Sequence, residues 1–350
     1  MSLTDPASAP DGLVSLNSNT ELIRVLRMVG PRVTAVAVAG VLGFLVDGRY
    51  GLAFGAIAGL AYILGAGIAA GHYAMDLHEA RVLDTGRAPA TNQLTESMAG
   101  DLGIEPPSVY RIEVERPQIC VTAVGFGRQV QGKIGVSYEL LQKADDEQLP
   151  QLIALAMARI WSGEATIMSS AATIAGFPLQ LARSHLVNGS ADWKIHDLEC
   201  GMSPIGKFIL IVSAPFSRQI LRLAGAAVSV LRSDRAALRL RHGRFAAPDL
   251  ENAIRWLHHQ QSPVVRDPIN EYNPAEVVLF LVSPFEVDFE QPGATTELPL
   301  WRRARFLVTS VVPHLELRLQ LLRDRVAELG PEILRPAPEP IDPFGRNIEL

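Results

Sequence analysis

Polar side chains that could bind a metal or transfer a proton gather at two places in the chain. The first is the pair His258-His259, whose members are adjacent in sequence and therefore point to different sides of a helix. The second is a mixed cluster in an expected loop, made of His196, Asp197, Glu199 and Cys200. Zinc enzymes space their ligands along a helix or loop beside a carboxylate that activates water. Neither group has that spacing, so we interpret both as surface polar residues.

Nucleophilic catalysis has no local signature in the sequence. The two cysteines, Cys120 and Cys200, lie in apolar surroundings and are too few for a disulfide framework or a thiolate zinc site. A Ser-His-Asp or Cys-His arrangement stays open, because its members meet only in space. The glycines Gly125 and Gly127 match neither a phosphate-binding loop nor a dinucleotide fingerprint and are typical of a turn at the end of a strand.

Composition places the chain closer to membrane proteins than to soluble ones. Of its 350 residues, 48% are hydrophobic and 20% are charged, and the mean hydropathy is +0.17. Soluble domains are usually about a quarter charged. The net charge of −5 is mild, which argues against a general nucleic-acid binder. The first twenty residues are polar, so they do not predict a secretory signal.

Two apolar runs predict a helical hairpin that crosses a membrane. Val33–Val46 and Tyr50–Gly71 are separated only by the polar turn Asp47-Gly48-Arg49. The second run reaches the ~20 residues that a crossing needs, and the first must borrow flanking residues or tilt. Lipid offers backbone groups no partner, so such a turn joins two helices. We expect a disordered tail at 1–30 and a transmembrane hairpin at 31–75; two helices of a soluble core are the alternative.

Small residues and flanking cations add detail to this hairpin. The small residues that favour close helix packing are Gly55, Gly59, Gly65 and Ala69. The flanking cations are Arg24, Arg27 and Arg32 before the hairpin and His72, Arg81 and Arg87 after it. The turn holds one Arg and one Asp. The positive-inside rule therefore places both ends of the hairpin in the cytoplasm.

The stretch 76–330 predicts a mostly helical α+β domain with a small β-sheet. Alternating or continuous apolar residues predict strands at 109–114, 119–126 and 133–137. Helical periodicity and breakers predict helices at 91–102, 138–142, 149–160, 249–257 and 301–329. Asp145-Asp146 would cap the start of the helix at 149–160, and Gly163 would end it.

Two further apolar stretches are candidate membrane helices, near 166–183 and 207–231. The first carries Pro178, and the second contains Arg218 and Arg222. Each could span the bilayer or lie on its surface, and an intramembrane Arg must snorkel or face a partner. The Pro-rich tail 331–350 is expected to be extended and available for docking; an inert linker is the alternative.

Six short segments follow one another in a characteristic order: His72–Met75, Arg81–Pro89, Leu102–Ile112, Pro117–Thr122, Ile134–Leu141 and Asp146–Leu149. With these segments the chain resembles the HtpX-type membrane zinc metalloproteases, relatives of the CAAX prenyl endopeptidases, over roughly Val33–Glu328. This resemblance implies a zincin-like (gluzincin) domain, a zinc cofactor and endopeptidase activity. It also implies that the active-site helix follows Leu149.

That helix lacks the residues the family uses. The family binds zinc through H-E-x-x-H and a later Glu, because two His at i and i+4 share a helical face and the first Glu deprotonates the bound water. The positions of the two His, the base and the third ligand fall on Leu155, Arg159, Ala156 and Arg235. Leu and Ala offer no lone pair, and Arg has no acceptor. We therefore predict a degenerate site with no catalytic residue, no cofactor-binding residue and no metal, so zinc is not expected.

Two arginines would then stand where the family holds zinc. Arg159 and Arg235 should approach each other, and two buried cations repel unless an anion lies between them. One hypothesis is that Asp234, Glu164 or a bound anionic group fills that role. The favoured alternative is that the helices separate and both guanidinium groups reach solvent or lipid headgroups.

These observations predict a non-catalytic pseudoprotease with its main domain in the cytoplasm and several passes through a bacterial-type inner membrane. It would bind membrane-protein partners or clients through the old substrate groove and the Pro-rich tail, and its other expected partner is the lipid bilayer. No nucleic acid is expected. An active zinc endopeptidase with non-standard ligands and a structural subunit of a larger envelope assembly are the alternatives.

Overall fold

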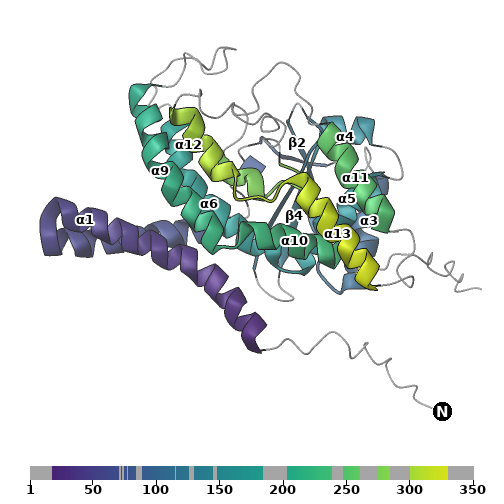
Figure 1. The fold of residues 1–350 in the computed structure, drawn as a ribbon, viewed down its shortest axis with the longest axis horizontal. Coiled ribbons are helices and arrows are strands. Elements are labelled where there is room, and N and C mark those ends of the chain that lie inside the picture. Colours follow the sequence, from purple (N-terminus) through teal and green to yellow (C-terminus); the bar gives the residue numbers. More distant parts are fainter. Residues whose placement is uncertain are drawn as a thin grey trace, which may run out of the picture.

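The computed structural model describes residues 18–70, 72, 75–76, 78–83, 89–114, 116–125, 130–144, 148–183, 203–238, 247–260, 274–283 and 300–329. Within these ranges the chain forms a long N-terminal helical hairpin, a small sheet and a set of packed helices (Figure 1). The helices are α1 (Ser18–Ala69), α3 (Pro89–Leu102), α4 (Tyr138–Lys143), α5 (Gln148–Trp161), α6 (Glu164–Arg183), α9 (Pro204–Leu223), α10 (Ala226–Ala237), α11 (Ala247–His259), the 3-10 helix η3 (Pro274–Val278), α12 (Leu300–Thr309) and α13 (Leu315–Leu329). The strands are β1 (Arg81–Val82), β2 (Ser108–Ile112), β3 (Ile119–Val124) and β4 (Gln131–Ser137).

The helix α1 is a hairpin that reverses at the predicted polar turn. Asp47 and Gly48 have non-helical backbone angles, and Gly48 has a φ of 53°, which favours glycine. The hairpin begins earlier than predicted, because the helix starts at Ser18. The expectation of a disordered tail is therefore wrong for 18–30, and residues 1–17 lie outside the described part of the chain.

Glycines let the two halves of the hairpin approach closely. A Cβ placed on Gly51 would lie 1.9 Å from the carbonyl oxygen of Gly43, and one on Gly55 would lie 2.3 Å from that of Ala39. Any side chain at these points would force the helices apart. Gly65, which the sequence also suggested, has nothing within 4 Å of such an atom and is not part of the contact.

The sheet is small and mixed, in the order β1-β2-β4-β3. β2 and β4 are parallel, whereas β1 pairs antiparallel with β2 and β3 pairs antiparallel with β4. The strands at 109–114, 119–126 and 133–137 are confirmed within a few residues; β1 has two residues, too short for a periodicity signal. β3 lies at one end of the sheet and is almost entirely buried. It packs against α5, the helix that carries the candidate site.

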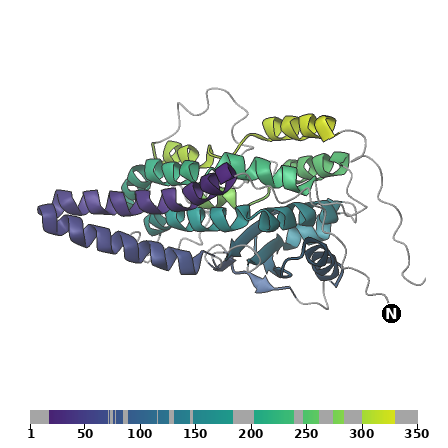
Figure 2. The same ribbon diagram turned by 90° about the horizontal axis from the view of Figure 1, so that it is seen from below.

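Two apolar cores lie on either side of the sheet. The first core joins β3 and β4 to α5, α11 and α13. The second core joins the hairpin to α6, α9, η3 and α12. Figure 2 shows the hairpin, α6 and α9 running side by side, with the sheet and its helices at the opposite end. The molecule is therefore mostly helical with a small sheet, as predicted.

The hairpin donates a hydrogen bond to a backbone carbonyl group in α6 that lacks its helical partner because of a proline. Pro178 has no N–H to donate to the carbonyl oxygen of Ile174, one turn earlier. The hydroxyl of Tyr62 in α1 donates to that oxygen at 2.5 Å. The hydroxyl of Ser217 in α9 donates to the neighbouring carbonyl oxygen of Ala175, at 2.7 Å. Neighbouring helices satisfy freed backbone groups in this manner where water is absent.

Two regions of the described chain are long and apolar enough to cross a membrane, Val25–Gly67 and Pro204–Ala237. The second region combines α9 and α10, because Gly225, with a φ of 72°, interrupts the single helix predicted near 207–231. The helix predicted at 301–329 is likewise two helices, since 310–314 with Pro313 separates α12 from α13. The predicted cap Asp145-Asp146, the cluster at 196–200 and the tail 331–350 lie outside the described residues.

Candidate functional site

The helix α5 carries the three positions that the family resemblance assigns to H-E-x-x-H. Every residue from Gln151 to Ile160 is buried, because the helix packs between β3, α3, α10 and α11. Gly163, with a φ of 73°, ends the helix as predicted. A helix buried on all sides presents its polar side chains only to other parts of the protein.

Leu155 and Ala156 are fully buried members of the first apolar core. Neither has an atom that can bind a metal or accept a proton. Among the described residues, no three His, Cys, Asp or Glu side chains are grouped so that they could hold a metal ion. His258 and His259 end α11 with ring centroids 6.1 Å apart.

Arg159 is 4% exposed and uses its guanidinium to bind backbone carbonyl groups. Its Nη1 donates to the carbonyl oxygen of Phe280 at 2.8 Å and to those of Val278 and Leu279 at 3.4 Å. Its Nε and Nη2 are buried and have no hydrogen-bond partner among the described residues. Arg159 therefore binds the backbone of residues 278–280 at the position where the resemblance places a zinc ligand.

Burial, together with repulsion by Arg318, lowers the pKa of Arg159 to about 9. The carboxylates of Asp234 and Glu164 oppose that shift. Because a pKa of about 9 still lies above neutrality, Arg159 carries a positive charge at pH 7. It acts as a donor of hydrogen bonds and as a buried cation.

The expectation that Arg159 and Arg235 approach each other is wrong. Arg235 is exposed, whereas its neighbour Asp234 is 1% exposed, because successive residues of a helix point about 100° apart. Asp234 accepts from Nε and Nη2 of Arg318 at 2.5 and 2.6 Å. The favoured alternative, in which both arginines reach solvent, holds for Arg235 and fails for Arg159. The suggested carboxylates, Asp234 and Glu164, do act on Arg159 electrostatically.

A second buried ion pair joins the hairpin to this region. Arg27 in α1 donates to both oxygens of Glu164, at 3.0 and 2.7 Å, and to the carbonyl oxygen of Ala224 at 2.8 Å. Arg232 lies 3.4 Å from the same carboxylate. Glu164 is the first residue of α6, so one carboxylate links α1, α6 and α10. Paired geometry of this kind makes a buried charge tolerable.

His78 and Glu276 form a third buried pair. The Nε2 atom of His78 lies 3.1 Å from the Oε2 atom of Glu276. The ring of His78 also packs edge-on against Phe280 at 5.6 Å between centroids. The sequence indicated Arg27 only as a cation that flanks the hairpin, and it did not single out His78, Glu276 or Arg318. These residues form pairs whose members lie 84 to 198 positions apart along the chain. Such pairs cannot be predicted from the local spacing of residues in the sequence.

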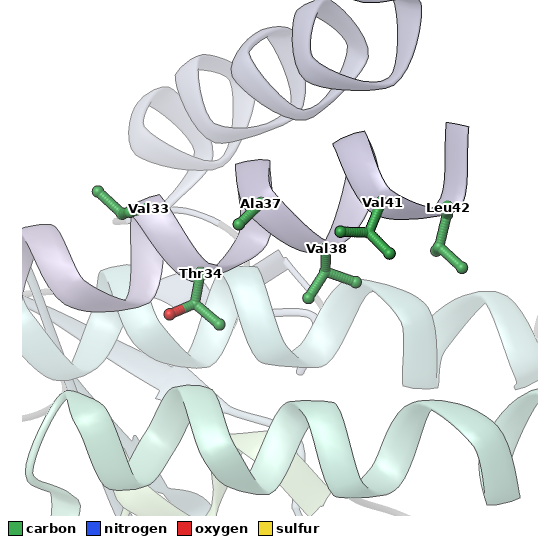
Figure 3. A pocket seen from close by; sticks show the side chains of 6 residues that line it. All are labelled: Val33, Thr34, Ala37, Val38, Val41 and Leu42. Carbon is green, nitrogen blue, oxygen red and sulfur yellow. The ribbon is translucent and has the colours of Figure 1, made fainter. Parts of the chain in front are cut away.

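An apolar pocket of about 350 Å³ lies along the first helix of the hairpin. Figure 3 shows the side chains that line it: Val33, Thr34, Ala37, Val38, Val41 and Leu42. The hydroxyl of Thr34 is the one polar side-chain group in that lining, so the pocket has no acid, base or metal ligand. It suits apolar contact and not catalysis.

Fold and site together define a mostly helical α+β protein whose described residues include two regions apolar enough to cross a membrane. A small mixed sheet and a buried helix are joined to apolar helices through paired charges.

The chain is 26% identical over 297 residues to a protein named Protease HtpX homolog from Pyrococcus abyssi, covering 83% of this chain and 91% of that protein. It is 25% identical over 233 residues to the protein of the same name from Methanocaldococcus jannaschii, covering 66% and 78%. For Aquifex aeolicus the identity is 24% over 264 residues, covering 74% and 79%. No family model and no solved structure matches the chain. The chain is therefore similar over most of its length to proteins of the HtpX type, which confirms the resemblance seen in the sequence.

Proposed function

We propose that the chain is a non-catalytic member of the HtpX-type family, a membrane pseudoprotease with a degenerate zincin-like domain. It would act as a binding or scaffold component for membrane-protein partners or clients. One observation carries this proposal: the buried face of α5 presents Leu155, Ala156 and a guanidinium that already binds peptide carbonyl groups.

Zinc does not fit this donor set. The family uses imidazole and carboxylate ligands, whereas Leu and Ala have no lone pair and Arg159 repels a cation. The nearby carboxylates are also engaged, because Asp234 pairs with Arg318, Glu164 with Arg27 and Glu276 with His78. A metal ion is therefore not part of the proposed function.

The proposed location is a bacterial-type inner membrane, crossed more than once, with the main domain in the cytoplasm. The apolar hairpin and the apolar α9–α10 region support membrane insertion. Exposed large apolar side chains on the hairpin, such as Leu45, Val46 and Phe54, support lipid contact. The cations that flank the hairpin support the orientation.

Metal analysis and a protease assay on the purified protein test the proposal. We expect less than stoichiometric zinc and no peptide cleavage that a chelator abolishes. The Aquifex aeolicus relative, purified and assayed in parallel, is the control for the metal measurement and the substrate. Stoichiometric zinc together with chelator-sensitive cleavage would favour the alternative of an active endopeptidase with non-standard ligands.

A structural role in a larger envelope assembly is the remaining alternative. Gentle solubilisation, affinity capture and mass spectrometry distinguish the two non-catalytic roles. A single partner recovered in fixed proportion would favour a subunit. A varied set of membrane proteins would favour a client-binding component.

A further inference from the structure

Three arginines, at the start of the hairpin and near the end of α9, have no carboxylate partner among the described residues. Arg32 is half-buried, and its Nη2 makes only a long contact of 3.4 Å with the hydroxyl oxygen of Ser170 in α6. Arg218 is half-buried in α9, and its Nε is buried without a hydrogen-bond partner in the described chain. Arg222 follows one turn later and is exposed.

Arg32 and Arg218 lie at a similar depth along the apolar helices. Arg32 contacts α6 at Ser170, and Ser217, the neighbour of Arg218, contacts α6 at the carbonyl oxygen of Ala175. The two contact points are five residues apart, which is about 7.5 Å along a helix. α1 also contacts α9 directly, and Figure 2 shows the hairpin, α6 and α9 running side by side. The unpaired arginines therefore concentrate positive charge at one level of these helices.

The apolar pocket of the hairpin begins next to this level. Its lining runs from Val33, the residue after Arg32, to Leu42, a rise of about 14 Å along the helix. Thr34, Val38 and Leu42 follow one another at four-residue spacing and point the same way (Figure 3). Val33 and Leu42 are 59% and 58% exposed, so the described parts of the protein leave this lining largely uncovered. The surface therefore combines an open apolar pocket with cations at one end.

An anionic phospholipid has the charge and the shape that fit this surface. Its phosphate accepts hydrogen bonds from guanidinium groups, and its acyl chain suits the apolar lining. Basic pockets between membrane helices on the cytoplasmic side bind anionic headgroups in this way. The proposed orientation places Arg32 on that side, where anionic lipids are concentrated.

A second copy of the chain fits the surface less well. Two copies that pack through this helix in one membrane share the same orientation, so Arg32 of one would lie at the depth of Arg32 of the other. No acidic residue lies between Val33 and Val46 to compensate these charges. A lipid headgroup supplies the missing negative charge at the required depth.

We propose that this surface binds one anionic phospholipid of the cytoplasmic leaflet, with its phosphate at the three unpaired arginines and an acyl chain along the pocket. Thr34 lies at the end of the pocket nearest the phosphate, where the ester oxygens of the lipid would be. The bound lipid compensates the charge of the arginines and so holds α1 against α6 and α9. This assignment rests on the membrane location proposed above.

Native mass spectrometry of the full chain in detergent tests the choice of lipid. The protein is titrated with phosphatidylglycerol or with phosphatidylcholine that carries the same acyl chains. We expect one phosphatidylglycerol to bind at least about fivefold more tightly, since a single basic contact near the headgroups contributes about that factor. Equal binding of the two lipids would overturn the proposal, and this comparison needs no variant.

Matched variants locate the binding surface. Arg32→Gln and Arg218→Gln should each weaken the binding of phosphatidylglycerol about fivefold and that of phosphatidylcholine less than about twofold. Arg49→Gln and Arg235→Gln remove exposed cations outside the surface and should leave both lipids unaffected. Ala37→Trp would fill the pocket from an exposed position and should weaken phosphatidylglycerol while all three arginines remain. An equal loss in Arg49→Gln and Arg32→Gln would show general attraction between charges and would overturn the proposal.

Competition and mass distinguish the other occupants. A large excess of inorganic phosphate should not displace the lipid; displacement would show a site for a free anion and would overturn the lipid assignment. A dimer that binds no phosphatidylglycerol would assign the surface to a second copy instead. Recovery of the chain without detergent would overturn both the membrane location and this proposal. Equal binding of the two lipids would overturn this proposal alone and would leave the proposed non-catalytic function untouched.

Discussion

Buried arginines organise the centre of this protein at the scale of single residues. Arg27, Arg159 and Arg318 are 7%, 4% and 3% exposed, and each binds either a carboxylate or a run of backbone carbonyl groups. A guanidinium suits this role because it carries five donors in a planar fork and stays charged. Charge compensation, and not an apolar core alone, therefore joins the hairpin, the helices and the sheet edge.

The pair Arg27–Glu164 gives a prediction at this scale. Arg27→Met should lower the free energy of unfolding by about 3–5 kcal/mol, because it leaves Glu164 buried with only the more distant Arg232. Arg235→Met is the matched control and should change it by less than about 0.5 kcal/mol. Thermal unfolding in detergent measures both. Equal midpoints for the two variants would show that the ion pair contributes no net stability.

At the scale of elements, the hairpin depends on small residues at its crossing. Gly51 and Gly55 face the backbone of the first helix, where even a methyl group would collide. The sequence predicted close packing from the density of small residues, but not which of them touch. That choice depends on the rotation of each helix about its axis, which the neighbours α6 and α9 influence.

The close contact between the two halves of the hairpin predicts that a change of glycine to alanine has opposite effects at Gly55 and at Gly65. Gly55→Ala should destabilise the hairpin by about 1–3 kcal/mol, because the new Cβ would lie 2.3 Å from the carbonyl oxygen of Ala39. Gly65→Ala meets nothing within 4 Å and should be neutral or stabilising by up to about 1 kcal/mol, since alanine favours a helix. Thermal midpoints of the two variants in the same detergent give the comparison. A lower midpoint for Gly65→Ala than for Gly55→Ala would contradict this packing.

At the scale of the whole molecule, the proposed orientation places the hairpin turn on the outer side and the helical domain in the cytoplasm. Arg49→Cys in the turn and Leu317→Cys in α13 place a thiol at each end, both in the Cys200→Ser background. In intact cells or spheroplasts, a membrane-impermeant maleimide should label the turn and should reach α13 only after permeabilisation. The reverse pattern would invert the topology.

The sequence by itself determined the local elements. Uninterrupted apolar runs, the turn Asp47-Gly48-Arg49 and the period of each segment predicted the hairpin, three strands and most helices, because these depend on neighbours within a few residues. The family resemblance also came from short segments in order.

Only the tertiary structure decided the composition of the candidate site. It turned Asp234 inward and Arg235 outward, paired Arg27 with Glu164, and seated 278–282 on β3 under Arg159. These contacts join residues more than 80 positions apart, and each depends on how a helix or strand is rotated when it packs. Hydrophobic periodicity predicts which face of an element is buried, but charges that meet across such distances leave no spacing in the sequence.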